Sequence, residues 1–113
     1  MERFVAAAVQ MASGPDREAN VTRASALVRE AAARGAQLVV LPEVFAWRGP
    51  RTGEAAHTEP VPGPTSEVMA AVARECRVHL CAGSFLEAVP GEPRAQPSGA
   101  GLRDPAYGQG RRV

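Results

Sequence analysis

The stretch GAQLVVLPEVFAWRG, residues 35–49, decides how this sequence is interpreted. It begins with Gly35 and contains the apolar run LVVL at residues 38–41. Pro42 and the acid Glu43 follow this run directly. A short continuous apolar run between turn residues is typical of a buried strand in a parallel sheet. The carboxylate of Glu43 is therefore expected at the end of a buried strand. The surrounding sequence is the evidence for whether this acid has a structural or a chemical role.

The segments on either side of this run predict alternating strands and helices. Strands are expected at residues 3–10, 37–41 and 78–85, and helices at residues 17–34 and 65–76. Both helices carry apolar residues at the i, i+3, i+4 and i+7 positions of one face. Gly35 is expected to end the first helix. The order strand-helix-strand-helix-strand predicts an α/β fold in which helices cover a parallel sheet.

The remaining segments show no such periodicity. Residues 44–63 are expected to form a long irregular loop. From residue 88 the sequence becomes rich in Gly, Pro and Arg, which predicts a disordered tail over residues 88–113. The organised part is therefore expected to be residues 1–87. Three strands and two helices make a thin core with uncovered sheet edges, so this part is interpreted as a piece of something larger or half of a dimer.

Composition excludes several classes of function. The chain of 113 residues has a net charge of +1, which does not indicate binding to nucleic acid or to an anionic membrane. No run is long enough to cross a membrane, and no secretory pattern begins the chain, so a cytoplasmic location is expected. Cys76 and Cys81 are then expected to be reduced thiols. All 13 positions counted as Lys or Arg are Arg.

Several motifs in order along the chain resemble one known family. They are Val9-Gln10-Met11, Asn20, Gly35-Ala36, Leu41-Pro42-Glu43 and the stretch PGPTSEVMAAVARECRVHLCAGSFLE at residues 62–87. This set resembles the N-terminal part of the nitrilase superfamily, the carbon–nitrogen hydrolases, over about residues 3–87. The style is closest to the branch of amidases that act on small ω-amides and on deaminated glutathione.

The resemblance implies a fold and a chemistry. The family fold is a four-layer α-β-β-α sandwich, of which this chain would form a part. A Cys attacks an amide or nitrile carbon, a Glu acts as general base and a Lys stabilises the tetrahedral species, without cofactor or metal. Glu43 matches the general base. A rigid strand end would hold it in place, and partial burial would suit a group that acts as base and acid near neutral pH.

The resemblance does not supply the other two catalytic residues. The family Lys would follow the third strand and the Cys would come later still, yet the sequence contains no Lys at all. We therefore expect a fragment that is inactive alone, with the tail as a frameshifted or prematurely ended reading. The substrate expected for an intact relative is a small amide or nitrile, and a homodimer is implied at most by analogy.

Structural explanations compete with each of these assignments. Glu43 could be a strand-end acid that caps the following loop. Cys76 and Cys81 fit small apolar core positions better than the nucleophile position. A metal site built from both cysteines and His79 would lack a fourth ligand other than His57, so no metal is expected. Phe45 and Trp47, which follow Glu43, could line a pocket or anchor the loop.

Two other functions remain open. The chain could be a non-catalytic α/β binding or interaction module that pairs its sheet edge with itself or with a full-length relative. It could also be a small enzyme that uses Glu43 and His57, although nothing in the sequence supplies a nucleophile or metal beside them.

Overall fold

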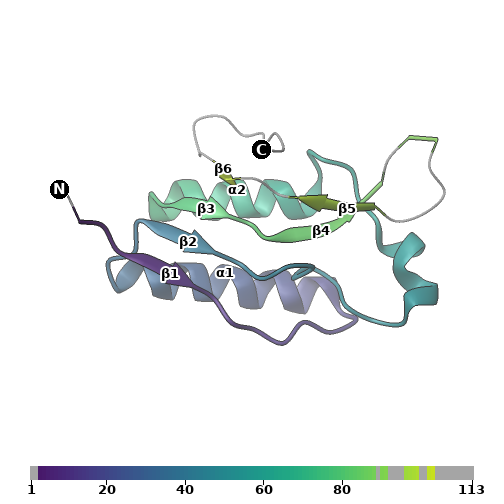
Figure 1. Ribbon diagram of the computed structural model, residues 1–113, viewed down its shortest axis with the longest axis horizontal. Coiled ribbons are helices and arrows are strands. Elements are labelled where there is room, and N and C mark those ends of the chain that lie inside the picture. The colour runs from purple at the N-terminus through teal and green to yellow at the C-terminus, as the bar shows by residue number, and fades with distance from the viewer. Residues whose placement is uncertain (1–2, 89, 92–95, 100–101, 104–113) are drawn as a thin grey trace.

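The structure places two helices on one side of a small parallel sheet. The computed structural model describes residues 3–88, 90–91, 96–99 and 102–103. In chain order the elements are β1 (Ala6–Ala8), α1 (Arg17–Ala33), β2 (Leu38–Val40), the 3-10 helix η1 (Arg51–His57), α2 (Pro64–Cys76), β3 (His79–Cys81), β4 (Ser84–Glu87), β5 (Gln96–Gly99) and β6 (Leu102–Arg103). Figure 1 shows the three parallel strands beside the two helices, with β4 continuing beyond β3. The strand-helix-strand-helix-strand order and the α/β class are confirmed.

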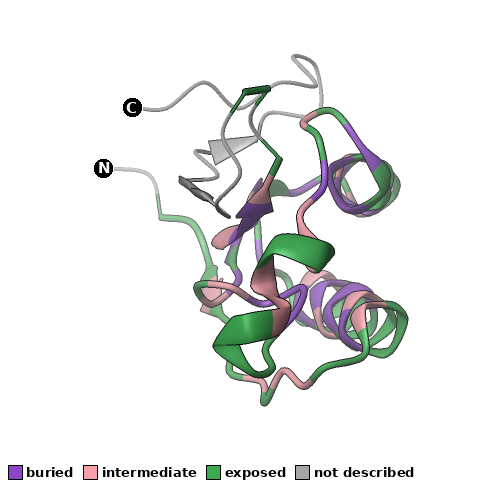
Figure 2. Cartoon of the chain, turned by 90° about the vertical axis from the view of Figure 1, so that its right-hand side faces the viewer, coloured by how far each residue is buried: buried purple, intermediate pink, exposed green. Residues whose placement is uncertain are grey.

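The sheet has one covered face and one open face. Its order is β1-β2-β3-β6, and the first three strands are parallel. Val39 of β2 and Leu80 of β3 lie side by side in the register and pack into the core against both helices. Both helices lie on the same side of the sheet in Figure 2.

The residues on either side of that row point the other way, because side chains alternate along a strand. We call the side they form the open face: Ala6, Ala8, Leu38, Val40, His79 and Cys81. None of these six residues is buried, and Val40 is 38% exposed. A parallel sheet normally has both faces covered, so the described residues supply one helix layer and one sheet layer of a sandwich.

Local signals explain where the two helices begin and end. The Asp16 carboxylate accepts a hydrogen bond from the backbone N–H of Ala19 (3.1 Å) and caps the start of α1. Gly35, at φ 92°, ends α1 as predicted. Pro64 occupies the first turn of α2, where its missing N–H costs nothing. Arg77, at φ 54°, ends α2 in the left-handed conformation.

The third predicted strand is wrong as a single element. Residues 78–85 contain β3 and the start of β4, separated at Ala82 and Gly83. Gly83 has a φ of 57°, which breaks the extended conformation. A Cβ at this position would lie 2.0 Å from the carbonyl oxygen of Pro42. The break therefore lets the β3–β4 junction pass directly against the end of β2.

Two other segments contain more regular structure than the sequence indicated. The expected loop at residues 44–63 includes η1. Within the expected tail, β5 pairs antiparallel with β4 and β6 pairs antiparallel with β3. Backbone pairing along a strand edge needs no apolar periodicity, so the apolar pattern could not indicate these strands. The other residues of 92–113 lie outside the described residues, and the boundary at residue 87 stays a prediction.

The core lies between the sheet and the two helices. The side chains that are fully buried and largest include Phe45, Phe85, Met69, Leu80, Val28 and Val39. Each contributes about 1.5–3 kcal/mol through burial of its apolar surface. In the described part of the chain, no helix is both long enough and apolar enough to span a membrane.

The close approach at Gly83 gives a stability prediction. We expect Gly83→Ala to lower the free energy of unfolding by at least about 2 kcal/mol, because the new Cβ is strained by the positive φ and collides with backbone atoms. Gly35→Ala is the matched control, since Gly35 also has a positive φ but no atom lies within 4 Å of the point that its Cβ would occupy. Urea denaturation of both variants measures the difference. Equal losses for the two variants would contradict the importance of the contact with Pro42.

Candidate active site

Glu43 lies at the carboxyl end of β2, the strand between β1 and β3. The N–H of Leu41 still donates to the carbonyl of Cys81 (2.8 Å), so the ladder extends one residue past β2. Pro42 then ends the pairing and Glu43 enters a turn. The Glu43 side chain is exposed. The expected position at a strand end is therefore found, and the Glu43 side chain is exposed there rather than partly buried.

The backbone of this turn is strained at the residue after Glu43. Val44 has a φ of 50°, a left-handed conformation that a β-branched residue rarely adopts. The N–H of Val44 donates to Oγ of Ser84 (2.9 Å), and the N–H of Phe45 donates to the carbonyl of Ser84 (3.2 Å). Strained backbone of this kind persists only where surrounding contacts fix it, and it is concentrated at functional sites.

The loop after the turn is anchored by buried polar contacts. Phe45 is fully buried, and its carbonyl accepts a hydrogen bond from Oγ of Ser13 (2.5 Å). The buried amide of Asn20 donates to the carbonyls of Ala46 (2.9 Å) and Gly14 (2.8 Å). Its Oδ1 accepts from the N–H of Gly14 (3.0 Å). Asn20 thus joins the first turn of α1 to both neighbouring loops.

Trp47 connects this loop to η1. Its Nε1–H donates to the carbonyl of Pro15 (3.0 Å), and its ring stacks on His57 with centroids 4.1 Å apart. The Nδ1 atom of His57 lies 2.7 Å from the carbonyl oxygen of Gly53, so Nδ1 carries the proton. Phe45 and Trp47 are both buried. They are loop anchors, which decides between the two roles that the sequence left open.

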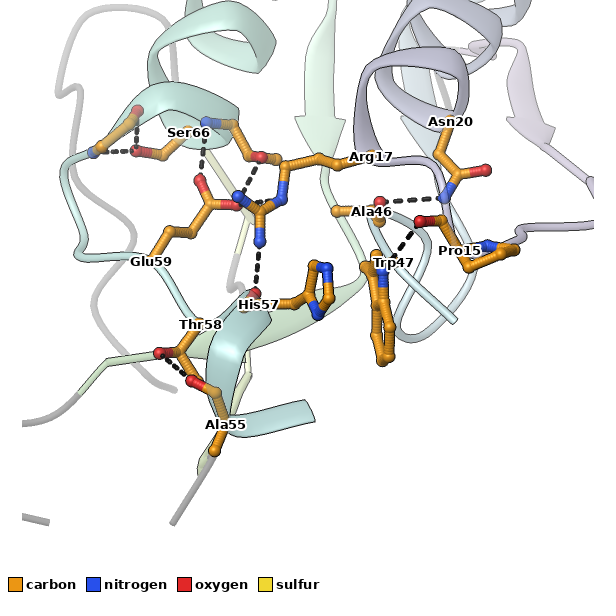
Figure 3. A network of polar contacts seen from close by, with 12 residues as sticks. Pro15, Arg17, Asn20, Ala46, Trp47, Ala55, His57, Thr58, Glu59 and Ser66 are labelled. Carbon is orange, nitrogen blue, oxygen red and sulfur yellow. Dashed lines mark hydrogen bonds and ion pairs between the residues drawn. The ribbon is translucent and has the colours of Figure 1, made fainter. Parts of the chain in front are cut away.

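A buried acid completes the network (Figure 3). Glu59 is 3% exposed, and its carboxylate accepts from the N–H and the hydroxyl of Thr65, both at 2.7 Å. Nε of Arg17 lies 3.2 Å from the same carboxylate, and the Arg17 guanidinium also donates to the carbonyl of His57. Both charges are paired at the start of α2, as burial of charge requires. These contacts tie α1, η1 and α2 together.

The two cysteines lie apart from this network. Cys76 is half-buried near the end of α2, with Sγ 3.9 Å from the Glu75 carboxylate. Burial raises the pKa of the Cys76 thiol, and the charge of Glu75 raises it further. A raised pKa leaves less thiolate, which is the opposite of what a nucleophile needs. Cys81 lies on the open face of β3.

The other candidate constellations are not assembled. No group of three or more His, Cys, Asp or Glu side chains within the described ranges could hold a metal ion. The His57 ring contacts Trp47 and Gly53. Within the described ranges, no hydrogen bond or ion pair joins His57 to Glu43. The groove of about 510 Å³ between α1 and α2 is lined by neither Glu43 nor a cysteine.

The arrangement therefore presents one exposed carboxylate at the carboxyl end of a parallel strand, on a strained and well-anchored turn. Ligands of open α/β sheets bind outside the carboxyl ends of the strands. The pattern of the family described as Carbon-nitrogen hydrolase matches residues 5–99. The chain belongs to the carbon-nitrogen hydrolase family.

Curated proteins and a solved structure agree with this membership. Omega-amidase NIT2-A of Xenopus laevis is 38% identical over 87 residues, which cover 77% of this chain and 32% of the relative. Omega-amidase NIT2 of Homo sapiens is 36% identical over the same length. The crystal structure of Saccharomyces cerevisiae Nit3, a member of branch 10 of the nitrilase superfamily, matches with a TM-score of 0.61 and 27% identity. That match covers 69% of this chain and 31% of Nit3.

This carbon-nitrogen hydrolase chain spans about a third of the length of these relatives. The resemblance to the nitrilase superfamily and to its ω-amidase branch, first inferred from motifs, is confirmed. The nitrilase-like fold of the organised part is confirmed as well.

Sequence patterns missed the residues that hold the site together. Glu59 lies in a Pro-rich segment without periodicity, and no pattern marked it as buried. Ser84 was predicted only as part of a strand. Asn20 was noted as a family feature, and a polar amide four residues after the helix cap was the one local signal of its role.

The buried contacts of Asn20 give a second prediction. We expect Asn20→Ala to lower the free energy of unfolding by about 2–3 kcal/mol, because it leaves the Ala46 carbonyl without its side-chain donor and the Gly14 N–H without its acceptor. Ser25→Ala is the control, since the buried Ser25 hydroxyl donates to the carbonyl of Val21 one turn earlier in the same helix (2.8 Å) and joins no second segment among the described residues. It should cost less than about 1 kcal/mol. Chemical denaturation that gives the same loss for both would refute a bridging role for Asn20.

Proposed function

We propose that this chain carries the general-base part of an amidase or nitrilase site, with Glu43 as the base. The observation that carries the proposal is the exposed carboxylate at the end of β2, fixed by the strained turn at Val44. The reaction is hydrolysis of a non-peptide carbon–nitrogen bond in a small amide or nitrile. The omega-amidase relatives favour a small ω-amide as substrate.

The role of Glu43 follows from the chemistry of thiol nucleophiles. A carboxylate near the attacking thiol accepts its proton as the sulfur attacks the carbonyl or nitrile carbon. With an amide, the carboxylic acid then returns the proton to the departing ammonia. With a nitrile, one water must first add to the thioimidate before ammonia can leave. In both cases the carboxylate takes a proton from the water that hydrolyses the thioester and gives it to the released thiolate. A Lys would stabilise the oxyanion of the tetrahedral species by its positive charge. Anchoring of the turn keeps the carboxylate in place through these steps.

We propose that this chain does not complete the reaction alone. It contains no Lys. Cys76 lies on α2 with a raised pKa, which leaves it poorly suited to attack. Glu43 would therefore act together with a Lys and a Cys that this sequence does not supply.

The test is an ammonia-release assay with succinamate, a small half-amide of a dicarboxylate. The purified chain should release no ammonia above the buffer rate, and Glu43→Gln should behave identically. Turnover by the chain that Glu43→Gln abolishes would overturn the proposed inactivity. It would at the same time support Glu43 as the base.

The open face favours a second candidate, an interaction module that pairs with a second copy. The face is apolar except for His79, and Val40 exposes 38% of its surface there. Under this alternative the chain sediments as a dimer, and Val40→Glu shifts it to monomer because a charge would be buried in the interface. Val68→Glu is the control, since Val68 is 41% exposed but lies on α2. A monomer at all concentrations in analytical ultracentrifugation would exclude this candidate.

A further inference from the structure

The junction between β3 and β4 lies against the turn that carries Glu43. Gly83 at this junction approaches the Pro42 and Leu41 carbonyl oxygens so closely that an added Cβ would lie 2.0 and 2.8 Å from them. The next residue, Ser84, makes two hydrogen bonds to the turn. Residues about 40 positions apart in the sequence therefore form one compact unit.

Ser84 contacts the two residues that follow Glu43. Its Oγ accepts from the N–H of Val44 (2.9 Å), and its carbonyl accepts from the N–H of Phe45 (3.2 Å). The second contact is made by backbone and is available to any residue at this position. The first requires a side-chain acceptor, and Ser is one of the few side chains short enough to provide it.

The conformation of Val44 shows why such an acceptor matters. A non-glycine residue in the left-handed region loses about 1–2 kcal/mol relative to its preferred conformations. Val is β-branched and is especially disfavoured there. The value of φ at Val44 sets the direction in which the preceding peptide and the Glu43 side chain point. A contact that holds Val44 at a φ of 50° therefore also fixes the direction in which the Glu43 side chain leaves the turn.

We propose that Ser84 is a positioning residue for Glu43, acting through its Oγ contact with the N–H of Val44. The catalytic meaning of this role rests on the proposed function, in which Glu43 is the general base. The structural role stands separately, because the hydrogen bond and the strain are both present in the chain as it is.

Other contacts of the loop cannot replace this one. Ser13 and Asn20 bind the carbonyls of Phe45 and Ala46, which lie on the far side of Val44 from Glu43. The Glu59–Arg17 pair acts further away, through η1. Within the described ranges, the Ser84 hydroxyl is the side-chain group that bonds to the backbone N–H of the residue adjacent to Glu43.

The experiment compares Ser84→Thr with Ser84→Val in the full chain by NMR. These side chains have the same shape, but only Thr keeps the hydroxyl. Ser13→Ala is the matched control, because it removes a serine hydroxyl that bonds to the same loop at Phe45. Three quantities are measured: the φ-dependent couplings of Val44, hydrogen exchange of its amide, and the side-chain couplings that report the Glu43 rotamer.

The proposal predicts a specific pattern of results. Ser84→Val should accelerate exchange of the Val44 amide by about fivefold, the effect of one lost hydrogen bond. It should also move the Val44 couplings away from a positive φ and average the Glu43 rotamers. Ser84→Thr and Ser13→Ala should leave all three close to the wild-type values.

Two results would overturn the proposal. One is a wild-type chain in which Val44 couplings or Glu43 rotamers are already averaged. The other is a Ser84→Val chain that keeps the wild-type Val44 couplings and a single Glu43 rotamer. Neither readout depends on hydrolysis, so the NMR pattern tests the positioning role separately from the proposed function. Ammonia release by the chain that Glu43→Gln leaves unchanged would count against Glu43 as the base and would leave the NMR pattern intact.

Discussion

The close contact between Gly83 and the end of β2 is the constraint on which the rest of this structure depends. The Pro42 carbonyl oxygen occupies the space that any side chain at residue 83 would need. Because the backbone bends there, β3 ends and β4 begins with Ser84 in reach of Val44. The two hydrogen bonds that hold the strained turn, from the N–H groups of Val44 and Phe45 to Ser84, depend on this approach of two backbones.

Much of the fold could be predicted from sequence because apolar periodicity reports burial directly. Met69 and Val72 occupy the i and i+3 positions of the apolar face expected on the second helix, and both are buried. Gly35 ended α1 because a positive φ is needed there. The single strand at residues 78–85 was wrong, because periodicity cannot show that a glycine inside an apolar run turns the chain. Only the contact with Pro42, far away in the sequence, gives Gly83 its conformation.

The candidate site was only partly predictable, for a similar reason. A carboxylate after a buried strand indicated Glu43, and motifs indicated the family, which the relatives confirm. Its supporting residues were not indicated, since Ser84, Asn20 and Glu59 act through hydrogen bonds that span 40, 26 and 6 positions. Hydrogen bonds of this kind leave no periodic pattern in the sequence from which they could be predicted. The exposure of Glu43 depends on which segments cover the turn, and sequence around the acid does not contain that information.

The two faces of the β1–β2–β3 sheet carry a further consequence, for how the sequence can vary. Along each strand, every second residue packs against the helices, and the residues between them belong to the open face. Polar replacements at Val39 or Leu80 would destroy the helix layer itself. Replacements at Leu38 or Val40 would leave that layer intact and would be tolerated or rejected according to what lies opposite. Sequence drift along these strands would therefore record two separate selective pressures, alternating residue by residue.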